Sequence, residues 1–152
     1  MNNNHEQLKS LVALQTFSFY KMVSSLANAT AFLAKILTDI NWVGFYLVQG
    51  DSLLLGPFWG EPACIELPFN KGVCGTAWAL AKTQVVADVN TFAGHIVCDS
   101  TSRSEVAIPL IQKGSVVGVL DVDSPLIDRF KPSDVAFLEK CGQIIQTYVP
   151  FA

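Results

Sequence analysis

The sequence predicts an α+β fold that combines a central antiparallel sheet with helices from the two ends of the chain. Two pairs of apolar, β-branched segments are each joined by a connection so short that the paired strands must run antiparallel. Apolar residues at helical spacing come before the first pair and after the second. The terminal helices are therefore expected to pack on one face of the sheet and the ligand loops on the other, in one domain over residues 1–152.

The N-terminal part, about residues 6–39, is expected to form two helices. Apolar residues recur at helical spacing between Leu8 and Leu26, which predicts one helix over that range. Asn28 is suited to cap a second helix, from Ala29 to Thr38, because its side-chain oxygen can accept a hydrogen bond from a free backbone N–H.

The sheet and its active-site loops are expected over about residues 41–124. Aromatic and β-branched residues predict strands from Trp42 to Val48 and from Ser52 to Trp59, which form a hairpin. Glycines and prolines then interrupt the chain until a helix from Gly72 to Ala81. A short strand from Gln84 to Ala87 is expected to follow this helix.

The last third of the chain begins with a long loop from Asp88 to Arg103, and loops of this length within a compact domain are usually functional. Two strong strands follow, from Glu105 to Gln112 and from Val116 to Asp123, joined by the turn Lys113-Gly114-Ser115. The C-terminal helix is expected over about residues 132–149, with Pro132 suited to its first turn.

Composition excludes several classes of function. Hydrophobic residues make up 51% of the chain and charged residues 15%, which predicts a dense core and an apolar face suited to a homodimer. The net charge is −3 and the basic residues are scattered, so no nucleic-acid partner is expected. No uncharged apolar run is long enough for a membrane span, and the first residues do not resemble a secretion signal, so we expect a cytoplasmic protein.

In a cytoplasmic chain, four cysteines indicate reduced, catalytic or metal-binding roles rather than a static disulfide framework. None of them forms a Cys-x-x-Cys pair, and His5 and His95 lie far apart, so no metal site and no cofactor are expected. Cys98 lies on the long polar loop, which offers little core for it to pack into. If the chain turns helical directly after Cys98, backbone N–H groups would favour its thiolate.

Three carboxylates are expected to meet on the last hairpin. Glu105 begins one strand, while Asp121 and Asp123 lie near the end of its partner and on one face of it, because side chains alternate along a strand. Clustered carboxylates cannot all ionise cheaply, so at least one is expected to hold a proton near neutral pH.

Several short motifs resemble a known family. The order of elements, together with Gly72-Val73-Cys74-Gly75 and the segments 41–46, 108–110 and 118–124, resembles the GAF domain. Within GAF domains, the chain resembles the free methionine-(R)-sulfoxide reductases over about residues 16–150. This closer resemblance lies in the contexts of three cysteines and three acids, in the segments 56–58, 62–64, 72–76, 94–100, 104–105 and 121–124.

The resemblance implies reduction of free methionine-(R)-sulfoxide, with thioredoxin as the electron donor. Cys98 is then the attacking thiol, which becomes a sulfenic acid and condenses with a second thiol to give a disulfide. Cys64 is favoured as that second thiol because proline and glycine flank its segment, and Cys74 is the alternative. Cys141 lies among apolar residues of the last helix and is expected to be inert.

The acids and two aromatic residues complete the site that the resemblance implies. Glu105 and Asp123 are expected near the sulfoxide, where one of them protonates its oxygen, and Asp121 near the ammonium group of the substrate. Trp42 and Tyr46 lie four residues apart on one face of a strand, and in the resembling family these aromatic residues accept the methyl end of the substrate.

Two other readings stay open. A non-catalytic GAF module that senses a small ligand would leave the thiols without a role, and an acidic pocket would repel the phosphate of a nucleotide. A GAF domain that attaches a chromophore would use one cysteine and leave Glu105, Asp121 and Asp123 unexplained. The reductase accounts for all of these residues at once.

Overall fold

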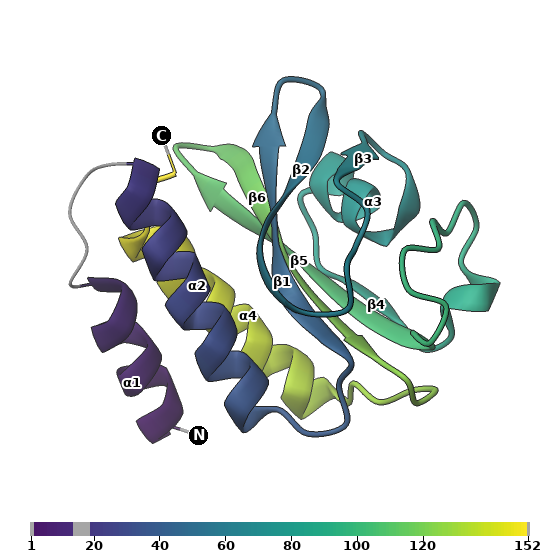
Figure 1. Ribbon diagram of the computed structural model, residues 1–152, viewed down its shortest axis with the longest axis horizontal. Coiled ribbons are helices and arrows are strands. Elements are labelled where there is room, and N and C mark those ends of the chain that lie inside the picture. The colour runs from purple at the N-terminus through teal and green to yellow at the C-terminus, as the bar shows by residue number, and fades with distance from the viewer. Residues whose placement is uncertain (1, 14–18, 152) are drawn as a thin grey trace.

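The computed structural model describes residues 2–13 and 19–151, which form a curled six-stranded sheet with helices on both faces (Figure 1). All neighbouring strands are antiparallel, and their order across the sheet is β3-β2-β1-β6-β5-β4. The strands are β1 (Trp42–Gln49), β2 (Ser52–Gly60), β3 (Glu66–Pro68), β4 (Gln84–Val86), β5 (Ser104–Gln112) and β6 (Ser115–Ser124).

The helices divide between the two faces as expected. The long helices α1 (Asn2–Ala13), α2 (Phe19–Ile36) and α4 (Pro132–Tyr148) share one apolar core with the sheet. The short helix α3 (Gly72–Leu80) packs on the opposite face, next to the loop that joins β4 to β5 (Figure 1). The predicted α+β architecture is confirmed.

Alternation along the strands builds two cores from the same sheet. In β1, Val43 and Phe45 belong to the core under the long helices, whereas Trp42 and Tyr46 belong to the core under α3. Because side chains change face at every residue, each central strand contributes to both cores.

The N-terminal helices differ from the prediction. The single helix expected from Leu8 to Leu26 is wrong, because α1 ends at Ala13 and α2 begins at Phe19; residues 14–18 of that range lie outside the described residues. Asn28 does not cap a helix but lies exposed in the middle of α2. The buried stripe of α2 continues across this position, so tertiary packing overrides the local capping preference: Met22, Leu26, Ala29 and Leu33.

The strands of the two hairpins lie within a residue or two of their predicted ends. The turn between β5 and β6 has two residues, Lys113 and Gly114, rather than three, and both have a positive φ. The short strand β3 was missed because only Leu67 is buried in it and its last residue is Pro68. The loop from Asp88 to Arg103 contains one short 3-10 helix, Val89–Thr91.

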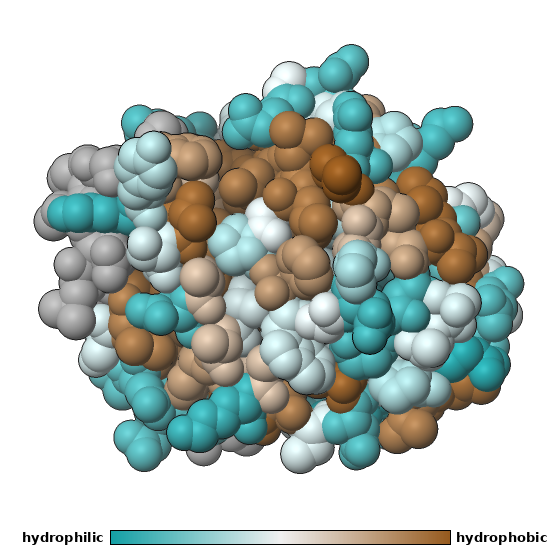
Figure 2. Space-filling view, in the orientation of Figure 1, coloured by the Kyte–Doolittle hydropathy of each residue, from teal (hydrophilic) through white to brown (hydrophobic). Residues whose placement is uncertain are grey.

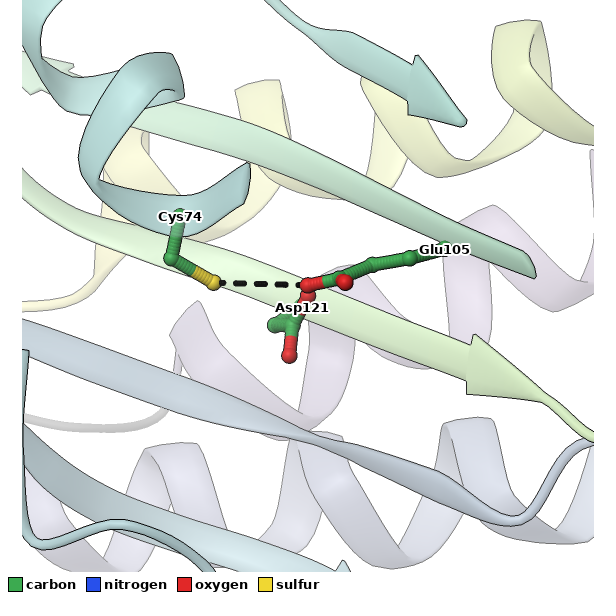
Figure 3. Close-up of side chains that lie close together, drawn as sticks. All are labelled: Cys74, Glu105 and Asp121. Atoms are coloured by element: carbon green, nitrogen blue, oxygen red, sulfur yellow. Dashed lines mark hydrogen bonds between the residues drawn. The ribbon is translucent and has the colours of Figure 1, made fainter. Parts of the chain in front are cut away.

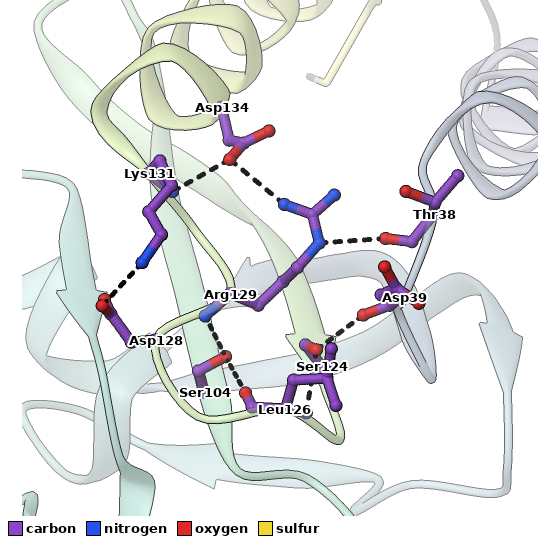
Figure 4. A network of polar contacts seen from close by, with 9 residues as sticks. All are labelled: Thr38, Asp39, Ser104, Ser124, Leu126, Asp128, Arg129, Lys131 and Asp134. Carbon is purple, nitrogen blue, oxygen red and sulfur yellow. Dashed lines mark hydrogen bonds and ion pairs between the residues drawn. The ribbon is translucent and has the colours of Figure 1, made fainter.

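A polar network fixes the ends of β5 and β6 near α4 (Figure 4). The hydroxyl of Ser104 donates to the backbone carbonyl of Leu126 at 2.6 Å, and that of Ser124 donates to the carbonyl of Asp39. Arg129 forms an ion pair with Asp134 at 3.1 Å. Since Ser104 and Ser124 are the chain neighbours of Glu105 and Asp123, the network fixes the backbone that carries these two acids.

Considerable apolar surface remains on the molecule. Figure 2 shows apolar residues gathered in the upper middle of the view, bordered by hydrophilic ones. Exposed large hydrophobic side chains occur on several elements, among them Tyr20 on α2 and Trp59 on β2. The homodimer expected from composition stays a prediction. Within residues 2–13 and 19–151, no helix has the length and hydropathy of a membrane span.

Candidate active site

A cavity of about 40 Å³ lies between the sheet, α3 and the loop that carries Cys98. It brings together nearly all the residues that the sequence singles out, although they come from five separate segments. The predicted residues that line it are Trp42, Tyr46, Cys74, Cys98, Glu105, Asp121 and Asp123. Cys64 is bonded to Cys98 but does not itself line the cavity.

The three acids meet because of the strand register. Glu105 on β5 pairs directly with Asp123 on β6, and Asp121 lies one side-chain repeat further along the same face. Glu105 is only 7% exposed and Asp121 only 5%. Such burial is unusual for carboxylates, which are almost never fully buried without a partner.

Burial raises the pKa of all three carboxyl groups. The pKa values of Glu105 and Asp123 lie well above their usual range, because burial is reinforced by the neighbouring charge of Asp121. Burial also raises the pKa of Asp121 itself, although hydrogen bonds with Glu105 and Cys74 act in the opposite direction. The cluster therefore retains protons at a pH where ordinary surface carboxylates have lost them.

Two buried acceptor atoms of this cluster are unsatisfied. The Oδ1 atoms of Asp121 and Asp123 have no hydrogen-bond partner among the described residues. An unpaired buried acceptor is costly, so a protonated or cationic group in the cavity would find two favourable positions here.

Cys74 donates a hydrogen bond into the acid cluster rather than pairing with another cysteine. Its Sγ lies 3.7 Å from Oε1 of Glu105, with Asp121 directly beside them (Figure 3). Burial, together with the charges of Asp121 and Glu105, raises the pKa of the Cys74 thiol well above its usual value, so this thiol stays protonated. The residue lies on α3, whose first residue Gly72 has a φ of +68°, a conformation that favours glycine.

The same three side chains are close enough to share a metal ion. Ligand atoms of Cys74, Glu105 and Asp121 all lie within 4.8 Å of one another. Their wide separation along the chain hides this grouping from any spacing motif. With the S–H of Cys74 donating to Glu105, the group is a hydrogen-bonded cluster of acids and a thiol.

Cys98 is joined to Cys64 by a disulfide, with 5.4 Å between their Cα atoms. Of the two candidates for the second thiol, the favoured Cys64 is therefore the one in bonding distance, while Cys74 and Cys141 are free and buried. Chain segments 34 residues apart in sequence are brought together, one from beside β3 and one from the long loop.

The two predicted aromatic residues stack and also fix the segment that leads to Cys64. The ring centroids of Trp42 and Tyr46 are 6.0 Å apart, and Phe58 also stacks on Trp42, at 5.3 Å. Nε1 of Trp42 donates to the carbonyl of Glu61, and the hydroxyl of Tyr46 donates to the carbonyl of Cys64 at 2.8 Å. These hydrogen bonds are not visible in the sequence.

Asn41 is a site residue that sequence reasoning missed. Its side-chain amide lies 3.0 Å from the carboxylate of Asp99 and from the hydroxyl of Ser102, so it ties the loop after Cys98 to the start of β1. Hydrogen bonds from Thr101 lower the pKa of Asp99 and keep it ionised. The chain after Cys98 forms this turn instead of the helix considered above, and only its position directly before a strand marked Asn41 in the sequence.

The fold defines a GAF domain, with a disulfide-bonded cysteine and three acids lining its cavity. The family model described as GAF domain matches residues 23–148, which is most of the chain. A relative from Escherichia coli K12, free methionine-R-sulfoxide reductase, is 49% identical over 125 residues, covering 78% of this chain and 76% of the relative. This chain belongs to the free methionine-R-sulfoxide reductase family, and it is accordingly an oxidoreductase.

Solved structures agree with this assignment. The reduced form of fRMsr of Staphylococcus aureus superimposes with a TM-score of 0.91 at 44% identity, covering 98% of this chain and 94% of the other. Free methionine-R-sulfoxide reductase from Neisseria meningitidis, in complex with its substrate, superimposes with a TM-score of 0.90 at 41% identity, covering 97% and 87%.

Proposed function

We propose that this chain reduces free methionine-(R)-sulfoxide to methionine, using Cys98 as the attacking thiol. The observation that carries the proposal is the shared cavity: the side chain of Cys98 lines it together with three acids whose pKa values are raised. Sulfoxide reduction needs a nucleophile that reaches the sulfur of the sulfoxide and a proton donor that reaches its oxygen.

In the first step, the thiolate of Cys98 attacks the sulfur of the sulfoxide while Glu105 or Asp123 protonates the sulfoxide oxygen. The oxygen is transferred to Cys98, which becomes a sulfenic acid, and methionine is released. The raised pKa values of Glu105 and Asp123 support their role as donors, because an acid must still hold its proton at the working pH.

In the second step, the thiol of Cys64 attacks the sulfenic acid of Cys98. A disulfide forms and water leaves, so the enzyme has supplied two electrons. The bond between Cys64 and Cys98 supports this pairing over one with Cys74. Thioredoxin then reduces the disulfide and returns both thiols, in the cytoplasm, where such dithiol donors are maintained.

The substrate is recognised at two groups, its ammonium group by charge and its methyl group by apolar contact. Asp121 is suited to the ammonium group of a free amino acid, because its buried Oδ1 atom lacks a partner. The stacked Trp42 and Tyr46 offer an apolar wall to the methyl group of the sulfoxide. A peptide-bound methionine has no ammonium group at this position, which supports a preference for the free amino acid.

The form with the Cys64–Cys98 disulfide is the one that remains after methionine has been released and before the donor reacts. A cavity of about 40 Å³ has room for about three water molecules, at 10–15 Å³ each, and not for an amino acid. Reduction of the Cys64–Cys98 bond releases the loop from Asp88 to Arg103 from the segment beside β3. Substrate binding is therefore expected only in the reduced enzyme.

The test is an assay of methionine formation from both sulfoxide epimers, free and within a peptide, with dithiothreitol as donor. Only the free R epimer is expected to react, and Cys98→Ser is expected to lower the rate by about 10³-fold or more, as for other lost nucleophiles. Cys141→Ser is the matched control, because Cys141 lies in the helical core. Wild-type turnover in Cys98→Ser would contradict the proposal.

A further inference from the structure

The disulfide must be reopened by an external dithiol after each turnover, so some part of the surface has to admit that donor. This requirement rests on the function proposed above. The reductant's sulfur has to approach one of the two cysteine sulfurs directly, because thiol–disulfide exchange is a nucleophilic substitution at sulfur. The surface beside Cys64 and Cys98 is therefore the place to look for a docking site.

Two exposed apolar side chains flank the disulfide. Ile65 follows Cys64 and is 76% exposed, while Val97 precedes Cys98 and is 64% exposed. Consecutive Cα atoms are about 3.8 Å apart, so with 5.4 Å between the cysteines the Cα atoms of Ile65 and Val97 are at most about 13 Å apart. Both cysteines are themselves partly accessible.

We propose that a thioredoxin-class dithiol protein docks on Ile65 and Val97 and attacks the sulfur of Cys64. Single exposed apolar residues are ordinary, but these two are the chain neighbours of the bonded cysteines, the one place a reductant must reach. The backbone of Ile65 is fixed, because its carbonyl accepts a hydrogen bond from the N–H of Leu55 at 2.8 Å. The docking surface is thus presented by a fixed sheet edge on one side and by the long loop on the other.

Few charged residues flank the disulfide along the chain. The charged residues nearest along the chain, Glu66 beside Ile65 and Asp99 beside Cys98, are both acidic. The carboxylate of Asp99 is already hydrogen-bonded to Thr101 and Asn41, so it is engaged within the loop. The affinity of the donor is therefore expected to depend weakly on salt concentration.

The position of the two sulfurs relative to the cavity selects Cys64 as the point of attack. Cys98 lines the cavity beside the acids, whereas Cys64 does not. Attack at Cys64 forms a bond between it and the donor, breaks the Cys64–Cys98 bond, and leaves the electron pair on Cys98 inside the cavity. The second thiolate of the donor then displaces Cys64, which takes up a proton, and the donor leaves as a disulfide.

The first experiment measures turnover of Ile65→Ser and Val97→Ser with thioredoxin and, separately, with dithiothreitol. Each substitution is expected to lower kcat/KM for thioredoxin about tenfold, equivalent to ~1.4 kcal/mol, and to leave the dithiothreitol rate unchanged. Tyr20→Ser is the control, because Tyr20 is 80% exposed but lies on α2, on the opposite face of the sheet.

Three outcomes would overturn the docking site. Unchanged thioredoxin kinetics in both variants, an equal loss with both donors, or an equal loss in Tyr20→Ser would each do so. Unchanged kinetics together with a change of oligomeric state would assign the surface to a second copy of the chain. Absence of turnover with dithiothreitol in the wild-type protein would instead refute the proposed function, so the two failures are distinguishable.

The second experiment identifies the attacked sulfur. The oxidised protein is mixed with a thioredoxin variant that lacks its second active-site cysteine, so that the mixed disulfide accumulates. Peptide mapping is expected to find the thioredoxin cysteine bonded to Cys64, with Cys98 as a free thiol. A mixed disulfide with Cys98 would overturn the assignment of Cys64.

Discussion

The two faces of the sheet are built from the same strands but serve different ends. On the face under the long helices, β6 contributes Leu120 and Val122 to an apolar core. On the face under α3, the same strand contributes Asp121 and Asp123 to the cavity. The first face buries apolar side chains, which stabilises the fold, while the second buries carboxyl groups beside its own apolar core, which destabilises the fold unless they keep their protons.

The cysteines show the same contrast. Cys141 is fully buried in the helical core, where burial raises its pKa to about 12 and makes it inert. Cys98 lies at the edge of the cavity, bonded to Cys64. Strand alternation thus gives one sheet an apolar face that stabilises the fold and a second face that carries the site.

The largest expected effect is the loss of activity when an acid of the cavity is replaced. Glu105→Gln and Asp123→Asn are each expected to lower kcat/KM by about 10²–10⁴-fold, because each removes a proton donor while keeping shape. Asp51→Asn is the control, since Asp51 is an exposed acid in the turn after β1. The measurement is kcat/KM with dithiothreitol as donor. An equal loss in all three variants would contradict a role of Glu105 and Asp123 in donating the proton.

Glu105→Gln and Asp123→Asn are also expected to be more stable than the wild-type protein. A carboxyl group with a raised pKa in the folded state holds its proton more tightly there than when unfolded, so stability falls as pH rises from the unfolded pKa, about 4, towards the folded one. Glu105→Gln should therefore melt a few degrees higher than the wild type at neutral pH and lose this advantage below about pH 4. The activity of the wild-type enzyme should also fall as the pH rises, because the proton donor loses its proton.

A substitution in the core under the long helices should instead lower stability and leave activity unchanged. Leu138 is fully buried in α4, so Leu138→Ala is expected to lower the free energy of unfolding by about 2–5 kcal/mol while the folded enzyme keeps its kcat/KM. Denaturant unfolding and the methionine assay measure the two quantities. Leu80→Ala on α3 is the exposed control, with little expected change. A large loss of kcat/KM in folded Leu138→Ala would show that the two faces are not separate.

The smallest effect is expected from a single hydroxyl at the cavity. Tyr46→Phe keeps the aromatic wall but removes the hydrogen bond to the carbonyl of Cys64, a loss of about 0.5–1.5 kcal/mol. Disulfide formation should slow several-fold, while the first release of methionine keeps its rate. Rapid mixing with separate detection of methionine and of thiols distinguishes the steps, and equal slowing of both would place Tyr46 in the first step instead.

Much of this architecture was predictable from the sequence, because strong periodic patterns reflect burial directly. The four main strands and the register that pairs Glu105 with Asp123 follow from alternation and a short turn. The break between α1 and α2 was not predictable from periodicity, and the exposed Asn28 was misleading because capping residues are also tolerated on a solvated helix face.

The contacts that fix the site were harder to predict. The hydrogen bonds from Asn41 to the loop and from Tyr46 to the backbone of Cys64 join segments far apart along the chain, and no local pattern records them. The depth of burial of Cys74 and the hydrogen bond from its thiol to Glu105 also depend on how α3 packs on the sheet. Residue types were visible in the sequence, but distances between them arise only in the fold.

The most direct test of the account follows the oxygen atom into the protein. Fully reduced Cys64→Ser protein is mixed with an equal amount of free methionine-(R)-sulfoxide, and a sulfenic-acid reagent is added before peptide mapping. We expect one methionine per chain and the label on Cys98, whereas the wild type should give the Cys64–Cys98 disulfide in place of the label. Methionine formed with Cys98 unlabelled, or with the label on Cys74, would contradict it.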